Sequence, residues 1–134
     1  MTDKPLERVR RFHKTFRIQS ATSPTIPDKK TQQLRIDLIQ EELDELKDAF
    51  AQNDIVAVAD ALGDLSVVID GTYETCGLSE YKDAISEEIF QSNMSKADEN
   101  GAPLLREDGK VLKSDRYFAP NIARILGKTC KDED

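Results

Sequence analysis

The sequence predicts an all-α protein, a helical bundle of about four main helices with a short C-terminal arm. Two observations predict this class. Apolar residues recur every three or four positions over long stretches. Charged residues make up 34% of the chain, while Trp is absent and Phe and Tyr are few, which leaves little for an all-β core.

The 134 residues suffice for one domain with a buried core. We expect that domain to span residues 1–126, with residues 127–134 as a flexible tail. The first helix is predicted from about Lys4 to Phe16, with Val9, Phe12, His13 and Phe16 on one face. Pro24 and Pro27 in the segment that follows exclude a regular helix there.

The second helix is predicted from about Lys30 to Gln52. Its apolar residues form one stripe, which we interpret as the packing seam, and its polar residues form the solvated side. The stripe contains Ile36, Ile39, Leu43, Leu46 and Phe50, and the polar side contains Gln33, Asp37, Gln40, Asp44 and Lys47. The second helix is expected to end before Asn53 and Asp54, and Asp54 is expected to cap the next helix.

The third helix, residues 55–77, is apolar over most of its circumference and is therefore predicted to be the central, buried helix. Gly77 is a candidate C-cap, and Ser79 is the candidate N-cap of a fourth helix over residues 79–95. That fourth helix is expected to bury Tyr81, Ile85, Ile89 and Phe90. Beyond it, turn dipeptides indicate a small hairpin or ordered arm over Leu104–Leu112, and a short helix is expected after Pro120.

The charge and the cysteines limit the class of function. A net charge of −7 disfavours nucleic-acid binding. Cys76 and Cys130 are too few for a disulfide framework or a cysteine-rich zinc site. The N-terminal residues have no apolar signal core, and no apolar run approaches the roughly 20 residues of a membrane span. We therefore expect a cytoplasmic protein, in the host cytoplasm if it is phage-encoded, without membrane or nucleic-acid partners.

The segment QEELDEL, residues 40–46, carries the clearest chemical pattern. Glu41, Glu42 and Glu45 are spaced by three and four, so they share about a third of the helix surface, at the edge of the apolar stripe. Most such patterns are simply solvated faces. A second acidic pair, on the next helix, argues for a shared site.

Asp60 and Asp64 form that second pair, at i and i+4 on a helix that otherwise reads as core. Burying unpaired carboxylates costs several kcal/mol, and the third helix contains no Lys or Arg to offset them. Consecutive antiparallel helices would bring both clusters face to face. Hard oxygen ligands in that arrangement predict Mg²⁺ or Mn²⁺; salt-bridged helix carboxylates are the alternative.

Polar residues near the C-terminus are candidate phosphate contacts. Lys96, Lys110 and Lys113 are spaced among turn residues and could reach phosphates that a metal also holds, whereas solvated surface lysines are the simpler interpretation. Asn93 is either a hydrogen-bond donor or a helix cap. His13 lies beside Phe12 and Phe16 and is more typical of a packed, hydrogen-bonded residue than of a catalyst.

Taken in order, these motifs resemble the MazG-like nucleoside triphosphate pyrophosphohydrolases, a superfamily shared with phosphoribosyl-ATP pyrophosphatases and dimeric dUTPases. The resemblance covers nearly the whole chain and is nearest to small single-domain bacterial and phage members. It rests on RRFHKTF, SPTIP, LRIDLIQEELDEL, DALGDL, SNMSK and DGKVLK. It implies that the helical bundle is MazG-like and oligomeric.

The resemblance also implies cleavage between the α and β phosphates with two or three Mg²⁺ ions per site. Glu41 and Glu42 would act as metal ligands or water activators, and Glu45 and Asp64 as metal ligands. Asn93 and the three lysines would contact phosphates. Family members have ExxD on the second acidic helix; here Ala61 stands at the Glu position, and Asp60 is the candidate substitute. Phe90 stands where close relatives have His.

The expected function is hydrolysis of a (deoxy)nucleoside triphosphate to the monophosphate and pyrophosphate, which controls a nucleotide pool. Phe12, His13 and Phe16 form the candidate base site, with Ile26, Gln19 and Ser20 nearby. A large apolar slot favours a purine such as (d)GTP. The alternatives are phosphoribosyl-ATP or dUTP hydrolysis and, outside enzymes, an acidic helical module that binds a basic partner. Such apolar helices also predict a homo-oligomer, and the resemblance implies a homodimer or a homotetramer.

Overall fold

The computed structural model describes residues 4–127 and is 61% helical, which confirms the all-α class. The chain divides into two compact units, Met1–Glu80 and Tyr81–Asp134. Whether residues 1–126 form one domain stays a prediction. The first unit holds α1 (Pro5–Phe16), α2 (Lys29–Ala51) and α3 (Ile55–Thr75), and the 3₁₀ turn η1 (Ser79–Tyr81) leads into the second. The second holds α4 (Lys82–Met94), β1 (Leu104–Leu105), β2 (Val111–Leu112) and α5 (Ile122–Ile125).

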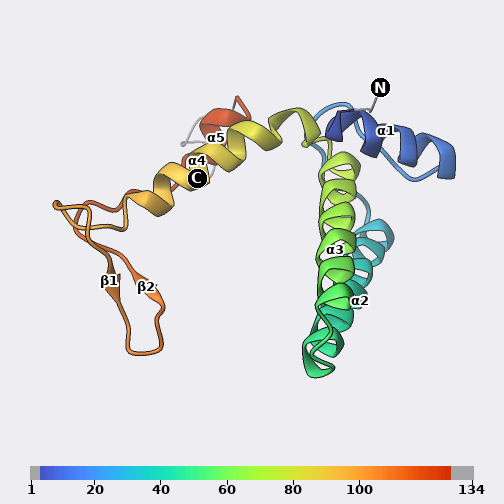
Figure 1. Cartoon of the computed structure of the whole chain (residues 1–134). Helices are drawn as coiled ribbons and strands as arrows, with labels where there is room; N and C mark the ends of the chain where they lie inside the picture. Colours follow the sequence, from blue (N-terminus) through green and yellow to red (C-terminus); the bar gives the residue numbers. More distant parts are fainter. Residues whose placement is uncertain (1–3, 128–134) are drawn as a thin grey trace. The chain divides into compact units, whose positions relative to one another are not determined.

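Helices α2 and α3 form an antiparallel hairpin that dominates the first unit (Figure 1). Asp28 caps α2 by accepting from the backbone N–H of Thr31. Asn53 adopts a left-handed φ of 52° in the tight connection, a conformation that asparagine tolerates. Asp54 then caps α3 by accepting from the N–H groups of residues 56 and 57, as predicted. The predicted bounds of both helices hold to within two residues.

The face of α2 that packs on α3 is not the predicted apolar stripe. Arg35 and Ala49 are buried, and Ile36 and Phe50 are 60% and 62% exposed. The contact face follows positions 35, 38, 42, 45 and 49, an alternation of three and four that includes two of the glutamates. Ile36, Leu43 and Phe50 of the predicted stripe are exposed beside this face, whereas Ile39 and Leu46 are half-buried. Residues 4–127 therefore cover the predicted seam only in part.

The prediction that α3 is buried is also wrong for the described chain. Val58 and Ala61 are buried, because small side chains let α2 approach closely. The remaining faces of α3 expose apolar side chains, including Ile55, Val56, Leu62 and Val67. An apolar circumference therefore indicates surface that avoids water, and the first unit covers only part of it.

The segment after α1 is tied to the C-terminal end of α3. The N–H groups of Ala21 and Thr25 donate to the carbonyls of Glu74 and Cys76, and the Thr75 hydroxyl donates to the carbonyl of Gln19. Gly77 follows the C-cap with φ of 70°, and a Cβ there would overlap the carbonyl of Ser23. A glycine is therefore required at the predicted cap position.

The second unit begins with a shorter α4 than predicted. Ser79 lies in η1 and donates to the Glu74 carboxylate, so it does not cap α4. Ile85 is buried, whereas Ile89 and Phe90 are exposed, contrary to prediction. The expected arm is a two-stranded antiparallel hairpin that pairs Leu104 with Leu112.

A short helix, α5, follows Pro120 as expected. Glu88 of α4 accepts from the Asn121 N–H and from Arg124, which holds α5 against α4. Cys130 and most of the predicted tail lie outside the described residues. Among residues 4–127, no helix combines the length and apolar character of a membrane span.

Candidate metal centre and adjoining pocket

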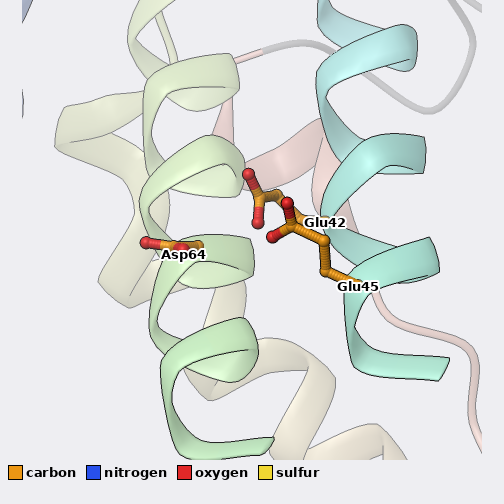
Figure 2. A group of neighbouring side chains, drawn as sticks. All are labelled: Glu42, Glu45 and Asp64. Carbon is orange, nitrogen blue, oxygen red and sulfur yellow. The ribbon is translucent and has the colours of Figure 1, made fainter. Parts of the chain in front are cut away.

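Three carboxylates converge where α2 faces α3. Glu42 and Glu45 extend from α2, and Asp64 comes from α3 (Figure 2). One carboxylate oxygen of each residue lies within 4.8 Å of those of the other two. The antiparallel register produces this meeting, because the same register brings Arg35 against Val68 and Thr72 two turns away. We name these three residues the acidic cluster.

Glu42 occupies the most enclosed position of the acidic cluster. Its Oε2 is buried and has no hydrogen-bond partner among the described residues. Burial, followed by the nearby carboxylates of Glu45, Asp64 and Glu41, raises its pKa from 4.5 to about 7. A carboxylate in these surroundings is ionised at neutral pH only at a cost that a cation would remove.

The donor set of the acidic cluster fits a hard divalent cation. Among residues 4–127, none of its three carboxylates has a Lys or Arg partner in an ion pair. The donors are carboxylate oxygens from two rigid helices, without the sulfur or imidazole ligands that favour softer metals. The unpartnered Oε2 of Glu42 supplies a lone pair for such an ion.

The other two predicted ligands lie outside the acidic cluster. Glu41 is exposed, and its charge acts on Glu42 from the neighbouring position of α2. Asp60 is exposed one turn before Asp64. Ala61, at the place where the resemblance leads one to expect Glu, is buried in the first unit. The structure thus brings together three of the five predicted metal residues.

A pocket of about 540 Å³ adjoins the acidic cluster in the first unit. Phe12 and His13 of α1 line it together with Leu38 of α2 and Val68 and Gly71 of α3. Leu38 is one turn from Glu42, and Val68 is one turn from Asp64, so the pocket begins about 6 Å along the helices from the carboxylates. A bound molecule can therefore reach both places.

Of the predicted base-site residues, Phe12 and His13 line this pocket, and Phe16 contacts Phe12 from outside it. The ring centroids of Phe12 and Phe16 are 4.7 Å apart. Phe16 is exposed and is not part of the pocket wall. Ile26 is also strongly exposed. The apolar slot is therefore built mainly from α1, α2 and α3, and the proline-containing segment contributes Ile18.

His13 is fully buried and held in one orientation. Its Nδ1 lies 3.1 Å from the carbonyl of Gln19 and 3.3 Å from the Ser20 hydroxyl. Because a carbonyl only accepts, the contact with Gln19 places the proton on Nδ1 and leaves Nε2 as an acceptor. Burial lowers the pKa of His13, so the ring is neutral at pH 7. It is a packed residue, as predicted, with one ring edge on the pocket.

Sequence analysis missed Arg35, a buried cation on the wall of the same pocket. Its Nε donates to the Thr72 hydroxyl at 3.1 Å, and its Nη2 donates to the Val68 carbonyl at 2.8 Å. A Cβ at Gly71 would stand 2.6 Å from Nη2, so this glycine makes room for the guanidinium. The i, i+3, i+7 spacing of residues 35, 38 and 42 places Arg35 on the same face of α2 as Glu42, and this spacing could have identified Arg35 from the sequence.

The predicted phosphate contacts all belong to the second unit. Asn93 and Lys96 lie at the end of α4, where the Lys96 N–H donates to the Asn93 carbonyl. The Lys110 N–H donates to Asp108 in the hairpin turn. The Lys113 ammonium lies 4.7 Å from the centre of the Tyr117 ring. Their role towards a ligand at the acidic cluster stays a prediction.

The chain was compared with protein families. The family model described as phosphoribosyl-ATP pyrophosphohydrolase matches residues 9–95, which is more than half of the chain. The matched region begins within α1, ends just after α4, and contains the acidic cluster and most of the residues that line the pocket. This family shares its superfamily with the MazG-like pyrophosphohydrolases. No curated protein matches the chain.

Proposed function

Because the chain belongs to the phosphoribosyl-ATP pyrophosphohydrolase family, within the MazG-like superfamily, we propose that it hydrolyses a (deoxy)nucleoside triphosphate to the monophosphate and pyrophosphate with Mg²⁺. The family match establishes pyrophosphohydrolase chemistry in general. Mn²⁺ is expected to substitute for Mg²⁺, since both accept hard oxygen ligands.

One observation carries the proposal: three carboxylates from facing helices meet around a buried, unpartnered oxygen of Glu42. Such an arrangement is costly without a cation. Glu42, Glu45 and Asp64 would hold Mg²⁺, with Glu41 and Asp60 completing a site of two or three ions. When bound, Mg²⁺ supplies the positive charge that lets a polyanionic triphosphate approach an acidic protein and that polarises its phosphates.

The protein's own residues supply the remaining functions. Glu41 or Glu42 is the candidate base that takes a proton from the attacking water. The raised pKa of Glu42 suits that exchange near neutral pH. Lys96, Lys110 and Lys113, with Asn93, are the candidate contacts of the leaving pyrophosphate, where positive charge stabilises the charge that develops.

The pocket beside the acidic cluster supports a base site. Phe12 offers an aromatic face, and Leu38 and Val68 offer apolar walls one turn from the metal ligands. A purine would cover more of this surface than a pyrimidine would, which favours (d)GTP or (d)ATP. We therefore propose pool control by a purine-preferring enzyme, with His13 orienting the base and Phe16 supporting Phe12.

Phosphoribosyl-ATP hydrolysis is the second candidate, and the family match favours it directly. Its triphosphate end would use the same carboxylates, so the acidic cluster does not discriminate between the two substrates. A dUTPase-type activity is the pyrimidine alternative. A module that binds a basic partner through its acidic helices is the non-enzymatic alternative.

Pyrophosphate release measured with the eight common (d)NTPs, with dUTP and with phosphoribosyl-ATP, each with Mg²⁺ or EDTA, tests the proposal. We expect release from a purine (d)NTP with Mg²⁺ and none with EDTA. Dominant turnover of phosphoribosyl-ATP or dUTP would assign the alternative substrate. Turnover that continues in EDTA would refute the role of the acidic cluster.

The absence of turnover on every substrate would favour the binding module. A homodimer or homotetramer and a cytoplasmic location complete the proposal.

A further inference from the structure

Arg35 is a buried charge whose donor groups are only partly used. A guanidinium has five N–H donors. The Nε–H of Arg35 and one N–H on Nη2 each donate to an acceptor in this structure. The other three N–H groups have no acceptor among residues 4–127. Arg35 also has no carboxylate partner there. Only 6% of the residue is exposed. Among residues 4–127, Glu42 Oε2 is the side-chain atom that is both sealed from solvent and without a partner, so the unused donors of Arg35 keep access to the pocket.

The unused donors belong to a residue that lines the pocket. Arg35 shares the wall of the cavity of about 540 Å³ with Phe12. The other charged residues of that wall, Arg8 and Asp70, have interaction partners of their own. A buried guanidinium beside a cavity is stabilised by a ligand with acceptor atoms in the plane of its fork.

The position of Arg35 along α2 selects the part of a nucleotide that it would meet. Arg35 precedes Glu42 by seven residues, or about 10 Å of helix. With the phosphates at the acidic cluster, as in the proposed function on which this step rests, the far edge of the base extends towards Arg35. The surrounding walls are mostly apolar, which suits a ring.

We propose that Arg35 is a specificity-determining residue that recognises guanine through its O6 and N7 atoms. Guanine presents these two acceptors side by side, which a guanidinium can bind with two parallel hydrogen bonds. Adenine presents an amino donor next to N7, so one N–H of Arg35 would face another N–H. Cytosine and uracil present no such pair of acceptors on that edge.

His13 supports this assignment. A Cβ placed on Gly71 would lie 3.1 Å from His13 Nε2 and 2.6 Å from Arg35 Nη2, so both groups border the space above this glycine. The Nε2 atom is an acceptor, because Nδ1 carries the proton. An acceptor beside the fork can receive the N1–H of guanine, which adjoins O6.

Binding of dGMP and dAMP to the metal-free protein, measured by calorimetry, tests the proposal without turnover. We expect the wild type to bind dGMP about tenfold or more tightly than dAMP. In Arg35→Lys, which keeps the charge and loses the planar fork, the ratio should fall towards one. Arg17→Lys, an exposed control, should keep the ratio.

A ligand series on the wild type covers the case in which Arg35→Lys does not fold. 7-Deaza-dGMP lacks only the N7 acceptor and should bind about tenfold more weakly than dGMP. Equal affinity of dGMP and dAMP, no binding of either, or full affinity for 7-deaza-dGMP would overturn the proposal. Displacement of dGMP by inorganic phosphate in the wild type and not in Arg35→Lys would assign Arg35 to a phosphate instead.

Because this test uses monophosphates without metal, its result is independent of pyrophosphate release. A guanine preference without any triphosphate turnover would keep the role of Arg35 and reject the proposed function. Turnover without a guanine preference would do the opposite.

Discussion

Glu42 of α2 and Asp64 of α3 place carboxylate oxygens within 4.8 Å of each other, although 22 positions separate them in the sequence. The hairpin at Asn53 and Asp54 produces this meeting, because it folds α3 back along α2 in a fixed register. The carboxylates of Glu42 and Asp64 repel each other in this half-buried site, so their proximity costs free energy. The cost is best explained by a cation that the apo protein is built to accept.

Removing one cluster carboxylate should abolish activity without unfolding the protein. We expect Glu45→Ala and Asp64→Ala each to lower kcat/KM at least about a hundredfold, because too few oxygens remain for Mg²⁺. The metal-free melting temperature should stay equal or rise, since each change relieves repulsion around Glu42. Pyrophosphate release and thermal melting measure the two effects.

Asp48→Asn serves as the matched control for these variants. Asp48 is an exposed carboxylate on the same helix, outside the acidic cluster. It should keep wild-type activity and the stabilisation of the protein by Mg²⁺. Wild-type turnover in both cluster variants, or unfolding of both, would contradict the assignment.

Glu42 should make the stability of the metal-free protein depend on pH. Its pKa is about 7 in the folded protein and near 4.5 when unfolded. The protonated form therefore favours folding, so its contribution is complete below about pH 4.5 and is lost as the pH rises through 7. Urea unfolding at several pH values in EDTA should show this decline between pH 4.5 and 7.

The variant Glu42→Gln tests whether ionisation of Glu42 causes that decline in stability. The variant cannot ionise, so its free energy of unfolding should fall less over the same range. Added Mg²⁺ should raise the stability of the wild type most at the upper end of the range, where Glu42 is ionised. A decline of the same size in Glu42→Gln would assign the pH dependence to other groups.

The exposed apolar stripe of α2 should lie in an interface between copies of the chain. Ile36, Leu43 and Phe50 are exposed at intervals of seven residues along α2. The other arm of the hairpin, α3, also exposes apolar residues. Burying such surface favours association. Light scattering at micromolar concentration should give a multiple of the 15.1 kDa chain mass.

Leu43→Glu should lower that mass, because it places a charge within the stripe. The same change at Lys14, an exposed residue of α1 outside the stripe, should leave the mass unchanged. A wild-type mass near 15.1 kDa would contradict the prediction.

The sequence pattern was sufficient to predict α2, α3 and the cap of α3, but not the start of α4, which Ser79 does not cap. The 3.6-residue period locates α2 and α3, and Asp54 caps α3 by the hydrogen bonds that its side chain is suited to accept. The meeting of Glu42 and Glu45 with Asp64 also follows, because a short connection forces antiparallel packing. These features depend on local chemistry, which a single sequence records.

The packing face of α2 could not be predicted in the same way. Apolar periodicity identifies side chains that avoid water, such as Ile36 and Phe50, without identifying what covers them. The face against α3 instead contains Arg35, which donates hydrogen bonds to Val68 and Thr72, and Glu42, whose Oε2 has no partner among the described residues. Arg35 was missed for this reason, because a buried cation contradicts the usual pattern.

Phe12 and Phe16 should differ in their effect on nucleotide binding, although both are aromatic residues on one face of α1. Phe12 lines the pocket, whereas Phe16 contacts the Phe12 ring from outside it. Phe12→Ala removes part of the surface on which a base would stack. Because Phe12 is half exposed, we expect KM for the preferred triphosphate to rise about fivefold, which corresponds to about 1 kcal/mol.

Phe16→Ala should raise KM less than twofold, since it only loosens the support of the Phe12 ring. The kcat of both variants should change little, because neither side chain belongs to the acidic cluster and the loss affects ground and transition states alike. Steady-state kinetics on the two variants separates these effects. Equal increases in KM would mean that the base lies against the outer face of α1, and a loss confined to kcat would place Phe12 in the positioning of the phosphates instead.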